Sequence, residues 1–303
     1  MHWESLKAVS MLIGISTPGF GASKIWPWPT TSLAHHIKEV FENTYRCYGS
    51  PRIVKALSNR GLRCGRTRVQ RLMKQEGLCP RQKRRFRPQT TQSHPCLPCA
   101  PNVVTELPPA PAPAQRFHSD ITYIPTKEGF VYLAATIDAF TRRCAGWCLR
   151  DNLVPPRQFG ASETIWCLRD NMETSLVKEA ALMAFGEKSD AQRLHHSDRG
   201  SQYTSEDFRS LLAKESIVQS MSRKGNCYDN ALSESFWATV KTECFDNFRS
   251  EIPSTKAQVV RSLFHYIELF YNRERLHCAL GYKSPVQFED DWTHDHCTEN
   301  VST

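Results

Sequence analysis

The sequence predicts an α/β protein: a mixed sheet with an all-helical domain before it and a helical extension after it. Residues 118–150 form three consecutive β-rich runs joined by short turns. Helical and strand patterns alternate over residues 173–243, and strands followed by such alternation are typical of a mixed sheet with helices on it. In the preceding part of the chain, before residue 88, apolar residues recur with helical periodicity. The first helices and the sheet therefore belong to different domains.

The chain of 303 residues is long enough for two or three domains. We expect five segments: an unassigned start (1–31), a helix-turn-helix domain with a basic arm (32–87), a proline-rich linker (88–116), the α/β core (117–248), and a helical extension with its tail (249–303). The linker contains eight of the eighteen prolines, a composition typical of a semi-rigid extended spacer.

The helical domain has the pattern of a helix-turn-helix. In SPRIVKALSNRG (50–61), Ile53 and Leu57 share one face, Ser50 is the expected N-cap and Gly61 the expected C-terminal stop. A second helix follows a turn that contains glycine. Its basic side chains are predicted to contact DNA: Arg66, Arg68, Arg71 and Lys74. On this pattern alone, a three-helix unit that binds protein remains an alternative.

Charge is distributed unevenly along the chain. Residues 1–100 hold 17 Lys and Arg against 4 Asp and Glu, a balance of +13, and residues 101–303 hold the remaining 22 against 27, a balance of −5. Neutralising phosphates with Lys and Arg is the sequence-independent part of DNA binding. A basic face that only keeps the protein soluble is the alternative. Because the charge coincides with the helix-turn-helix pattern, we expect a nucleic-acid partner.

Three acidic residues stand out in the core. Asp120 lies in the predicted strand FHSDITYI, Asp198 ends the predicted strand RLHHSD, and Glu234 lies on the predicted helix NALSESFWATVKTE. There are 35 residues between Asp198 and Glu234. Carboxylates brought together in this way are hard oxygen ligands for Mg²⁺ or Mn²⁺. Two such ions about 3.5–4 Å apart activate one oxygen and stabilise another leaving phosphorus. The pattern therefore indicates a site that cuts and joins nucleic acid.

Three motifs resemble those of a known family: HSDRGSQYTS (196–205), SMSRKGNCYDNALSESF (220–236) and YNRERLHCALGYKSP (271–285). They resemble the D-D-(35)-E transposases of bacterial insertion sequences, in particular the second-frame (OrfB) protein of the insertion-sequence-3 family, which is kin to retroviral integrases. The resemblance implies a ribonuclease-H-like core. In such a core the first two carboxylates sit on neighbouring central strands and the glutamate comes from a facing helix.

Carried onto this sequence, the resemblance makes Asp120, Asp198 and Glu234 the catalytic residues and the ligands of two Mg²⁺ (or Mn²⁺) ions. On the helix that carries Glu234, the apolar side chains recur every four residues, and Lys241 lies with Glu234 on the opposite face, about 10 Å away. The resemblance assigns Lys241 to a DNA phosphate. From the helix alone, an ordinary solvent-exposed face with one acid and one base is the alternative.

The loop that precedes this helix, SRKGNCYDN (222–230), is predicted to lie over the active site. Arg223 and Lys224 are further candidates for DNA contacts, and Asp229 or Asn230 is the expected helix cap.

Several other polar residues are assigned structural roles. Asp138 is expected to cap a turn. His196 and Ser197 are expected to flank the site, with metal binding by the pair His195 and His196 as the alternative. Cys96 and Cys99 form half of a zinc motif, but a structural zinc needs four ligands and no second pair follows. In the closing motif, Arg275 and His277 are expected to brace the domain, with contact to DNA ends as the alternative.

One feature departs from the family pattern. The hexapeptide WCLRDN occurs at 147–152 and again at 166–171, an offset of 166 − 147 = 19 residues. We interpret the extra residues as an insertion or duplication between the third strand and the first helix of the core, with LVPPRQFGASETI (153–165) as a loop. Loops at such edges tolerate insertion. We therefore expect the fold to survive, and the activity of this copy is the open question.

The function that these features predict is a DNA transposase with a metal-dependent catalytic core. Its partners would be double-stranded DNA (the terminal inverted repeats and a target), further copies of the same chain and, as the resemblance implies, an upstream-frame (OrfA-type) protein joined to it by frameshifting. No apolar run approaches 18 residues, so we expect a cytoplasmic, nucleoid-associated protein. Two alternatives stay open: a DNA-binding remnant without catalysis, and a ribonuclease-H-like nuclease that cuts but never joins.

Overall fold

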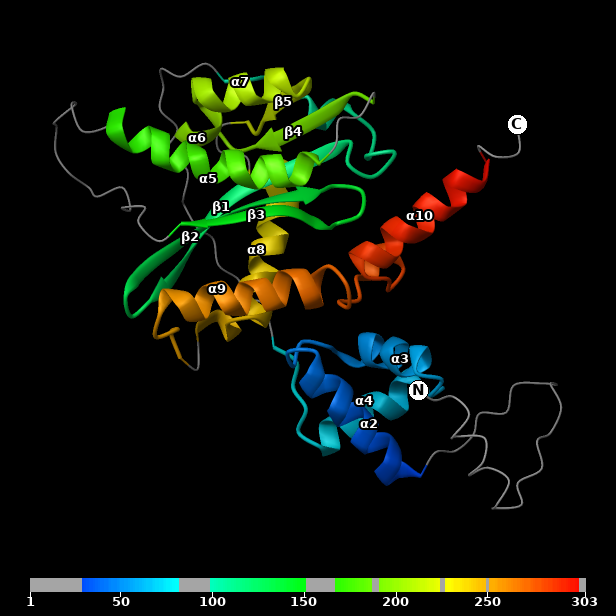
Figure 1. Cartoon of the computed structure of the whole chain (residues 1–303). Helices are drawn as coiled ribbons and strands as arrows, with labels where there is room; N and C mark the ends of the chain where they lie inside the picture. The colour runs from blue at the N-terminus through cyan, green and yellow to red at the C-terminus, as the bar shows by residue number, and fades with distance from the viewer. Residues whose placement is uncertain are drawn as a thin grey trace, which may run out of the picture.

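The computed structural model describes six stretches of the chain: residues 29–81, 99–150, 167–186, 191–223, 227–248 and 251–299. Four sequence-based expectations lie outside them: most of the basic arm (82–87), Cys96 of the zinc half-motif, the inserted loop (153–165) and Lys224. Figure 1 shows the α/β core in its upper part and the bundle of helices α2 to α4 below it.

Five strands form one mixed sheet in the order β3-β2-β1-β4-β5. They are β1 (Arg116–Thr126), β2 (Gly129–Asp138), β3 (Cys144–Arg150), β4 (Arg193–Ser197) and β5 (Ile217–Met221). The first three are antiparallel neighbours, whereas β4 is parallel to both β1 and β5. Parallel neighbours need a crossover connection, and helices supply it. The predicted three strands followed by helix–strand alternation are confirmed.

Helices cover both faces of this sheet (Figure 1). α5 (Cys167–Phe185) and α7 (Glu206–Lys214) lie on one face, and α8 (Ala231–Glu243) and α9 (Lys256–Phe264) lie on the other. Successive side chains of a strand point to opposite faces, so β1 sends Phe117 into the core under α5 and Ile124 into the core under α8. The central strands are therefore apolar on both sides.

Gly146 of β3 is the point where the sheet comes closest to α5. A Cβ atom added there would lie 2.0 Å from the carbonyl oxygen of Ala180 and 2.7 Å from the backbone nitrogen of Ala184. We expect Gly146→Ala to lower the free energy of unfolding by about 3 kcal/mol, because strand and helix must separate. Chemical denaturation measures the change. Gly65→Ala is the control, because its added Cβ meets nothing within 4 Å, and an equal loss in both variants would contradict the prediction.

The N-terminal bundle consists of α2 (Thr30–Asn43), α3 (Ser50–Asn59) and α4 (Arg66–Gln75). The predicted apolar stripes are its core, with Ile37, Ile53 and Val69 fully buried. Gly61 has a φ of +79° just after α3, which confirms its role as the helix stop.

The prediction that Ser50 is the N-cap of α3 was wrong. Gly49 has the extended backbone of the N-cap, and Ser50 is already helical. The reason is Pro51, which fits the first turn of a helix because the N–H it lacks would have no partner there.

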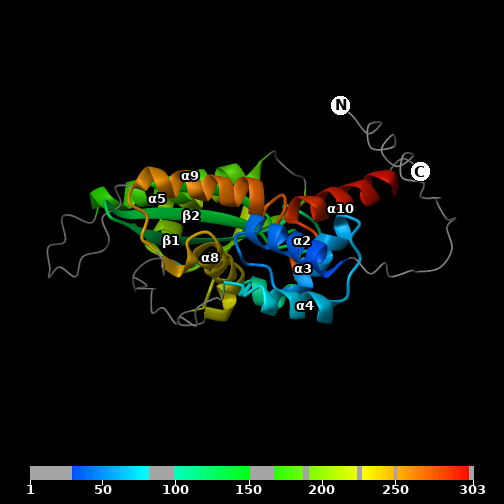
Figure 2. The same ribbon diagram turned by 90° about the horizontal axis from the view of Figure 1, so that it is seen from below.

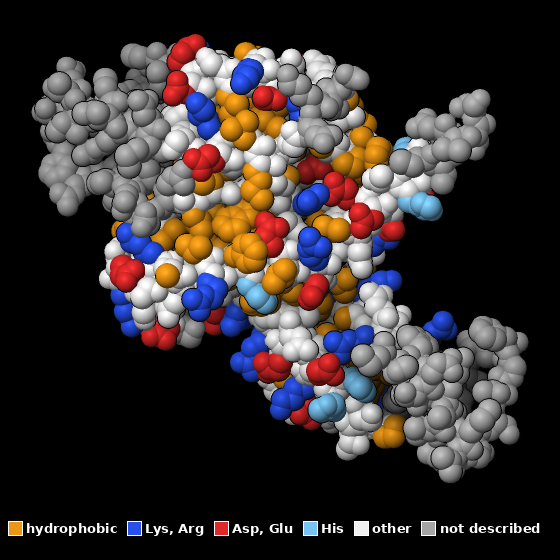
Figure 3. All heavy atoms as spheres, in the orientation of Figure 1, with side chains coloured by type: hydrophobic (Ala, Val, Ile, Leu, Met, Phe, Trp, Pro, Cys, Tyr) orange, Lys and Arg blue, Asp and Glu red, His pale blue; other side chains and the backbone are white. Residues whose placement is uncertain are grey.

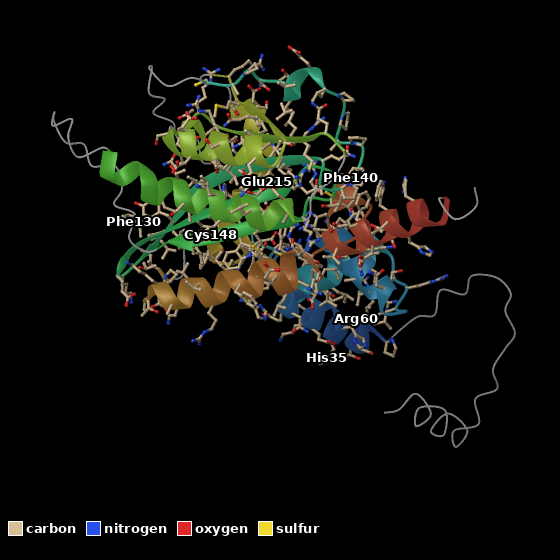
Figure 4. The ribbon with its side chains drawn as sticks, turned by 45° about the horizontal axis from the view of Figure 1, so that its top comes forward. His35, Arg60, Phe130, Phe140, Cys148 and Glu215 are labelled. Carbon is tan, nitrogen blue, oxygen red and sulfur yellow. The ribbon has the colours of Figure 1, made fainter. Side chains whose placement is uncertain are left out.

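The C-terminal extension begins with α9 and continues into a wider π-helical turn, η5 (His265–Tyr271). The predicted apolar stripe is buried, including Leu263, Ile267 and Phe270. α10 (Pro285–Glu299) follows, and its Phe288 and Trp292 pack on Phe140 of the turn after β2, with ring centroids 5.4 and 5.9 Å away (Figure 4).

The described part of the proline-rich segment, from residue 99 onward, is not a free spacer. Met221 donates its backbone N–H to Pro101, Val103 donates to the hydroxyl of Ser220 at 3.0 Å, and Leu194 donates to Gln115 at 2.8 Å. These bonds attach the segment to the β4 and β5 side of the sheet. The proline-rich composition predicted an extended spacer. The structure differs because β5 is an edge strand, and an edge strand offers backbone and side-chain groups to any extended neighbour.

The two copies of WCLRDN adopt different structures. Trp147–Arg150 belongs to β3, whereas Cys167–Asn171 belongs to the start of α5. The secondary structure of these identical residues therefore depends on their surroundings and not on their intrinsic propensity. Within the described residues, no helix is long and apolar enough to cross a membrane.

Candidate active site

Asp120 lies on β1, and Asp198 is the first residue after β4, the strand that pairs with β1. β1 and β4 are parallel with His118 opposite His196, so continuing this register by two residues brings Asp198 level with Asp120. Each carboxylate accepts a local backbone hydrogen bond, from the N–H of Ile121 at 2.8 Å to Asp120 and from the N–H of Gly200 at 3.0 Å to Asp198.

Electrostatic interactions connect the side chains of Asp120, Asp198, Glu234 and Lys241. Burial raises the pKa of Asp120 well above its usual value, the negative charges of Asp198 and Glu234 raise it further, and the ammonium of Lys241 opposes them. Burial also raises the pKa of Asp198. Raised pKa values of this kind are typical of buried carboxyl groups that lie close to one another.

Glu234 stands in the first turn of α8 and is exposed. Phe236, Trp237 and Val240 are buried and hold the helix on the sheet. Lys241 is partly buried and its Nζ lies 5.4 Å from the centre of the Tyr123 ring on β1, so it does not have the position that the alternative of an ordinary solvent-exposed face requires. Burial lowers the pKa of Lys241. The side chain of Lys241 thus reaches toward β1, whereas Glu234 is exposed.

The donor set suits a divalent cation: three hard carboxylate oxygens, two of them on partly buried side chains. Among the residues that the structure describes, however, no three His, Cys, Asp or Glu side chains converge closely enough to form a ready coordination shell. The three carboxylates therefore fit a divalent cation by their charge and by the type of ligand atom, and not by a preformed coordination geometry.

A pH-dependent melting experiment tests this site. Asp120 and Asp198 bind protons more tightly in the folded than in the unfolded chain, so they stabilise the fold at low pH and this stability is lost as pH rises through their raised pKa values. A divalent cation replaces the protons. We therefore expect Mn²⁺ to raise the melting temperature more at pH 7 than at pH 5, with a gain of about 2.7 kcal/mol at a hundredfold excess over its Kd.

Asp120→Asn is the matched control for this melting experiment, because it keeps the shape of the side chain and removes the charge. The Mn²⁺ effect should shrink in this variant at pH 7. An effect of Mn²⁺ that is equal at both pH values, or equal in the variant, would contradict the assignment.

The two histidines and Asp138 have the structural roles that the sequence predicts. His195 Nε2 is 2.8 Å from the hydroxyl of Ser119, and His196 Nδ1 is 2.9 Å from the hydroxyl of Ser220. Burial lowers the pKa of His195 to about 3 and that of His196 to about 4, so both rings are neutral and join neighbouring strands. Asp138 caps the turn after β2, where it accepts hydrogen bonds from residues 114, 140 and 141.

The loop before α8 is closed by an ion pair. Arg223 donates from its backbone and its guanidinium to Asp229, which lies in the 3-10 turn η3 (Cys227–Asn230) and also accepts from the side chain of Asn102. Arg223 thus has a structural partner, although 58% of its side chain is exposed. Asn230 stands at the N-cap position of α8, but its side chain makes no capping hydrogen bond there.

Sequence reasoning missed Tyr203, in the short helix α6 (Ser201–Thr204). Its side chain is buried, and within the described residues its hydroxyl has no hydrogen-bond partner. Burial raises its pKa, and the charges of Asp120 and Asp198 raise it further, which places the phenol near both carboxylates. The available signal was its place five residues after Asp198 in the motif HSDRGSQYTS.

The predicted DNA-contacting residues of α4 lie on its outer side. Arg66, Arg71 and Lys74 are exposed, and Arg68 is partly buried. Arg275 braces the fold, as predicted: it forms a buried ion pair with Glu243 at the end of α8.

Comparisons with known proteins agree with this architecture. Residues 30–86 match the family described as HTH-like domain, and residues 161–227 and 215–285 match two families described as integrase core domain. Together with the sheet order, these matches confirm the ribonuclease-H-like core and the helix-turn-helix domain.

Similar proteins cover most of the chain. A 31 kDa protein of insertion element IS600 from Shigella sonnei is 37% identical over 86% of this chain and 88% of its own length. The transposase for insertion sequence element IS904 from Lactococcus lactis is 37% identical over 85% of this chain and 93% of its own. The transposase InsF for insertion sequence IS3A from Escherichia coli is 34% identical over 82% and 79%.

Proposed function

This chain belongs to the IS3 family of insertion-sequence transposases, and from that premise we propose that it cleaves and joins the ends of its element by metal-dependent phosphoryl transfer. The main support is the arrangement of the elements: the parallel pairing of β1 and β4 brings Asp120 and Asp198 together, and α8 carries Glu234 and Lys241 close enough for their charges to act on Asp120. Carboxylates that repel one another beside a lysine are suited to hold cations and a phosphate together.

Asp120, Asp198 and Glu234 would hold two Mg²⁺ or Mn²⁺ ions. When bound, the pair of ions supplies Lewis-acid chemistry, which activates the attacking oxygen and stabilises the leaving oxygen. The residues of the chain position the DNA for this step. Lys241, partly buried over Tyr123, would pair with a phosphate oxygen beside the site. The hydroxyl of Tyr203, which has no hydrogen-bond partner among the described residues, would be available to donate to one of the carboxylates.

The helix-turn-helix domain would bind the terminal inverted repeats through α4. We expect Arg71→Ala and Lys74→Ala each to reduce the slope of log K against log salt concentration by about 1, because each removes one phosphate contact. Binding isotherms at four or more salt concentrations measure the slope.

Arg60→Ala is the matched control for the salt titrations. Arg60 is an exposed base on the same domain (Figure 4), but its guanidinium is paired with Glu39 at 2.9 Å. A slope that falls equally in the Arg60 variant would show that general charge, and not the α4 surface, binds the DNA.

The assembly on DNA would contain further copies of the chain, because joining two ends requires two active sites. α9 offers one suitable surface: its Val260 and Phe264 are 44% and 53% exposed, and Figure 3 shows hydrophobic side chains gathered between α5 and α9. An upstream-frame (OrfA-type) protein, joined by frameshifting, would be the second protein partner.

The insertion after β3 favours one second candidate function, that of a DNA-binding remnant without catalysis. β3 and α5 pack directly on each other, so extra residues between them act on the core that supports Asp120. A ribonuclease-H-like nuclease that cuts but never joins is less well supported, because such an enzyme does not require a helix-turn-helix domain.

Strand joining tests the proposed function. Labelled duplex DNA with the terminal repeat of the element would be incubated with the intact chain, and with a chain that lacks residues 147–165, in Mg²⁺ or Mn²⁺. Joined products from the intact chain support the transposase. Products from the shortened chain alone mean that the insertion inactivates this copy. DNA binding without products from either chain would favour the remnant.

A further inference from the structure

The helix-turn-helix domain is attached to the catalytic core by specific contacts. Tyr45, after α2, packs on Phe270 of η5 with ring centroids 4.8 Å apart, and its hydroxyl is 2.6 Å from His265 Nδ1. Tyr48 accepts a 2.7 Å hydrogen bond from the backbone N–H of Leu276. After α4, Arg81 donates to the backbone oxygen of Glu243. The domain is thus joined to the core at two places, the connection between α2 and α3 and the segment after α4.

The turn that carries Tyr45 adopts an unfavourable backbone. Tyr45 and Arg46 have φ values of 56° and 55°, in the left-handed region that non-glycine residues rarely adopt. Two such residues in succession persist only where surrounding contacts hold them. The docking contacts of Tyr45 therefore determine the shape of this turn.

The attachment meets the catalytic helix α8 at a buried ion pair. Glu243, the last residue of α8, accepts from Arg275 Nε and Nη2 at 2.7 and 2.6 Å and from the hydroxyl of Tyr266 at 2.7 Å. Both charged side chains are 5% exposed. Glu234 lies nine residues earlier on the same helix, about 14 Å along its axis. A short, rigid path therefore links the domain to the active site.

The DNA-binding and catalytic elements also face the same way. In Figure 2, α4 and α8 lie toward one side of the molecule, away from α9 and α10. One continuous duplex bound along α4 can therefore extend toward the residues on α8.

We infer that the docked helix-turn-helix domain acts as a ruler, which fixes the distance along the DNA between the bound terminal repeat and the phosphate at the active site. Tyr45 and Tyr48 are positioning residues in this arrangement. They act through η5, Arg275 and α8 and touch no reacting atom. The inference rests on the proposed function and adds how the position of the cut is chosen.

Photo-crosslinking tests the ruler without requiring catalysis. In the full-length chain, Glu234 would be replaced by a photo-crosslinking amino acid, and the crosslinked nucleotide would be mapped on a duplex carrying the terminal repeat. The docked chain should mark one nucleotide, or two neighbours. The double variant Tyr45→Ala/Tyr48→Phe should protect the same repeat in a footprint, with affinity within about threefold, and spread its crosslinks over several positions.

Glu42→Ala is the matched control, because it removes only the exposed ion pair with Arg46 beside the same turn. It should keep the single crosslink. If the double variant loses the footprint through misfolding, Tyr48→Phe alone, which removes one hydroxyl, replaces it. The inference is overturned if the undocked variants mark the same single nucleotide, or if the docked chain marks none.

The two proposals fail in different ways. A single crosslink in a chain that, with Glu234 intact, joins no strands would contradict the proposed function and leave the ruler standing. If both the intact chain and the undocked variant join strands at the same single phosphate, the ruler is contradicted and the proposed function stands.

Discussion

Glu234→Gln should lower metal-dependent strand joining by about 100- to 1,000-fold, the loss that follows removal of one preorganised group that stabilises a transition state. The substitution keeps the size of the side chain and removes the charge that raises the pKa of Asp120. Because Glu234 is exposed, the fold should not change. Product formation against time, with Mg²⁺ and with Mn²⁺, measures the loss.

The matched control for this variant is Glu206→Gln on α7, whose carboxylate is exposed and paired with Arg209. It should join strands at the normal rate. Both variants should bind terminal-repeat DNA equally well. Normal joining by Glu234→Gln would remove this residue from the catalytic set and favour a site formed by Asp120 and Asp198 alone.

Arg275→Ala should lower the free energy of unfolding by about 3–5 kcal/mol, the cost of leaving one charge of a buried pair without its partner. Burial alone would raise the pKa of Glu243, but the hydrogen bonds and charge of Arg275 hold it below the usual value. In the variant, the buried carboxylate of Glu243 would keep the hydrogen bond from Tyr266 but lose its paired cation. Urea denaturation followed by tryptophan fluorescence measures the change.

The exposed ion pair between Lys283 and Asp291 provides the comparison for the stability loss in Arg275→Ala. Lys283 and Asp291 are 48% and 53% exposed, so Lys283→Ala should cost about 1 kcal/mol or less. The double variant Arg275→Met/Glu243→Leu should recover most of the lost stability, since apolar residues of similar volume replace a buried pair well. Equal losses for Arg275→Ala and Lys283→Ala would show that the pair at the end of α8 is not buried in solution.

Much of the fold followed from periodicity. Alternating apolar residues placed β1, β2 and β3, and the four-residue repeat of Phe236 and Val240 placed α8 with its buried side correct. These elements were predictable because their local pattern and their tertiary environment agree. The position of Asp138 in a turn followed for the same reason.

Other features depend on contacts between distant segments, which local patterns do not contain. Cys148–Arg150 is a strand and Cys167–Arg169 a helix although the three residues are identical, so the local sequence alone does not determine the structure of this segment. The attachment of Pro101 to β5 depends on an edge strand more than 100 residues later. The environment of Lys241 over Tyr123 likewise required the sheet itself.

The sequence also predicts some residues of the candidate site and not others. The motifs predict the three carboxylates as the catalytic set, which stays a prediction, and the register of β1 and β4 agrees with the expected placement of the first two. Tyr203 did not follow, because a buried phenol in a short helix has no distinctive pattern. The pairing of Arg223 with Asp229 was also missed, since an exposed arginine in a loop reads as a DNA contact until its partner is known.

Anomalous diffraction from crystals of the intact chain grown with Mn²⁺ tests the central claim most directly. The account predicts two peaks about 3.5–4 Å apart, shared by the carboxylates of Asp120, Asp198 and Glu234, with the second peak lost in Glu234→Gln. Mn²⁺ at some other place, or no ion between Asp120 and Asp198, would contradict it.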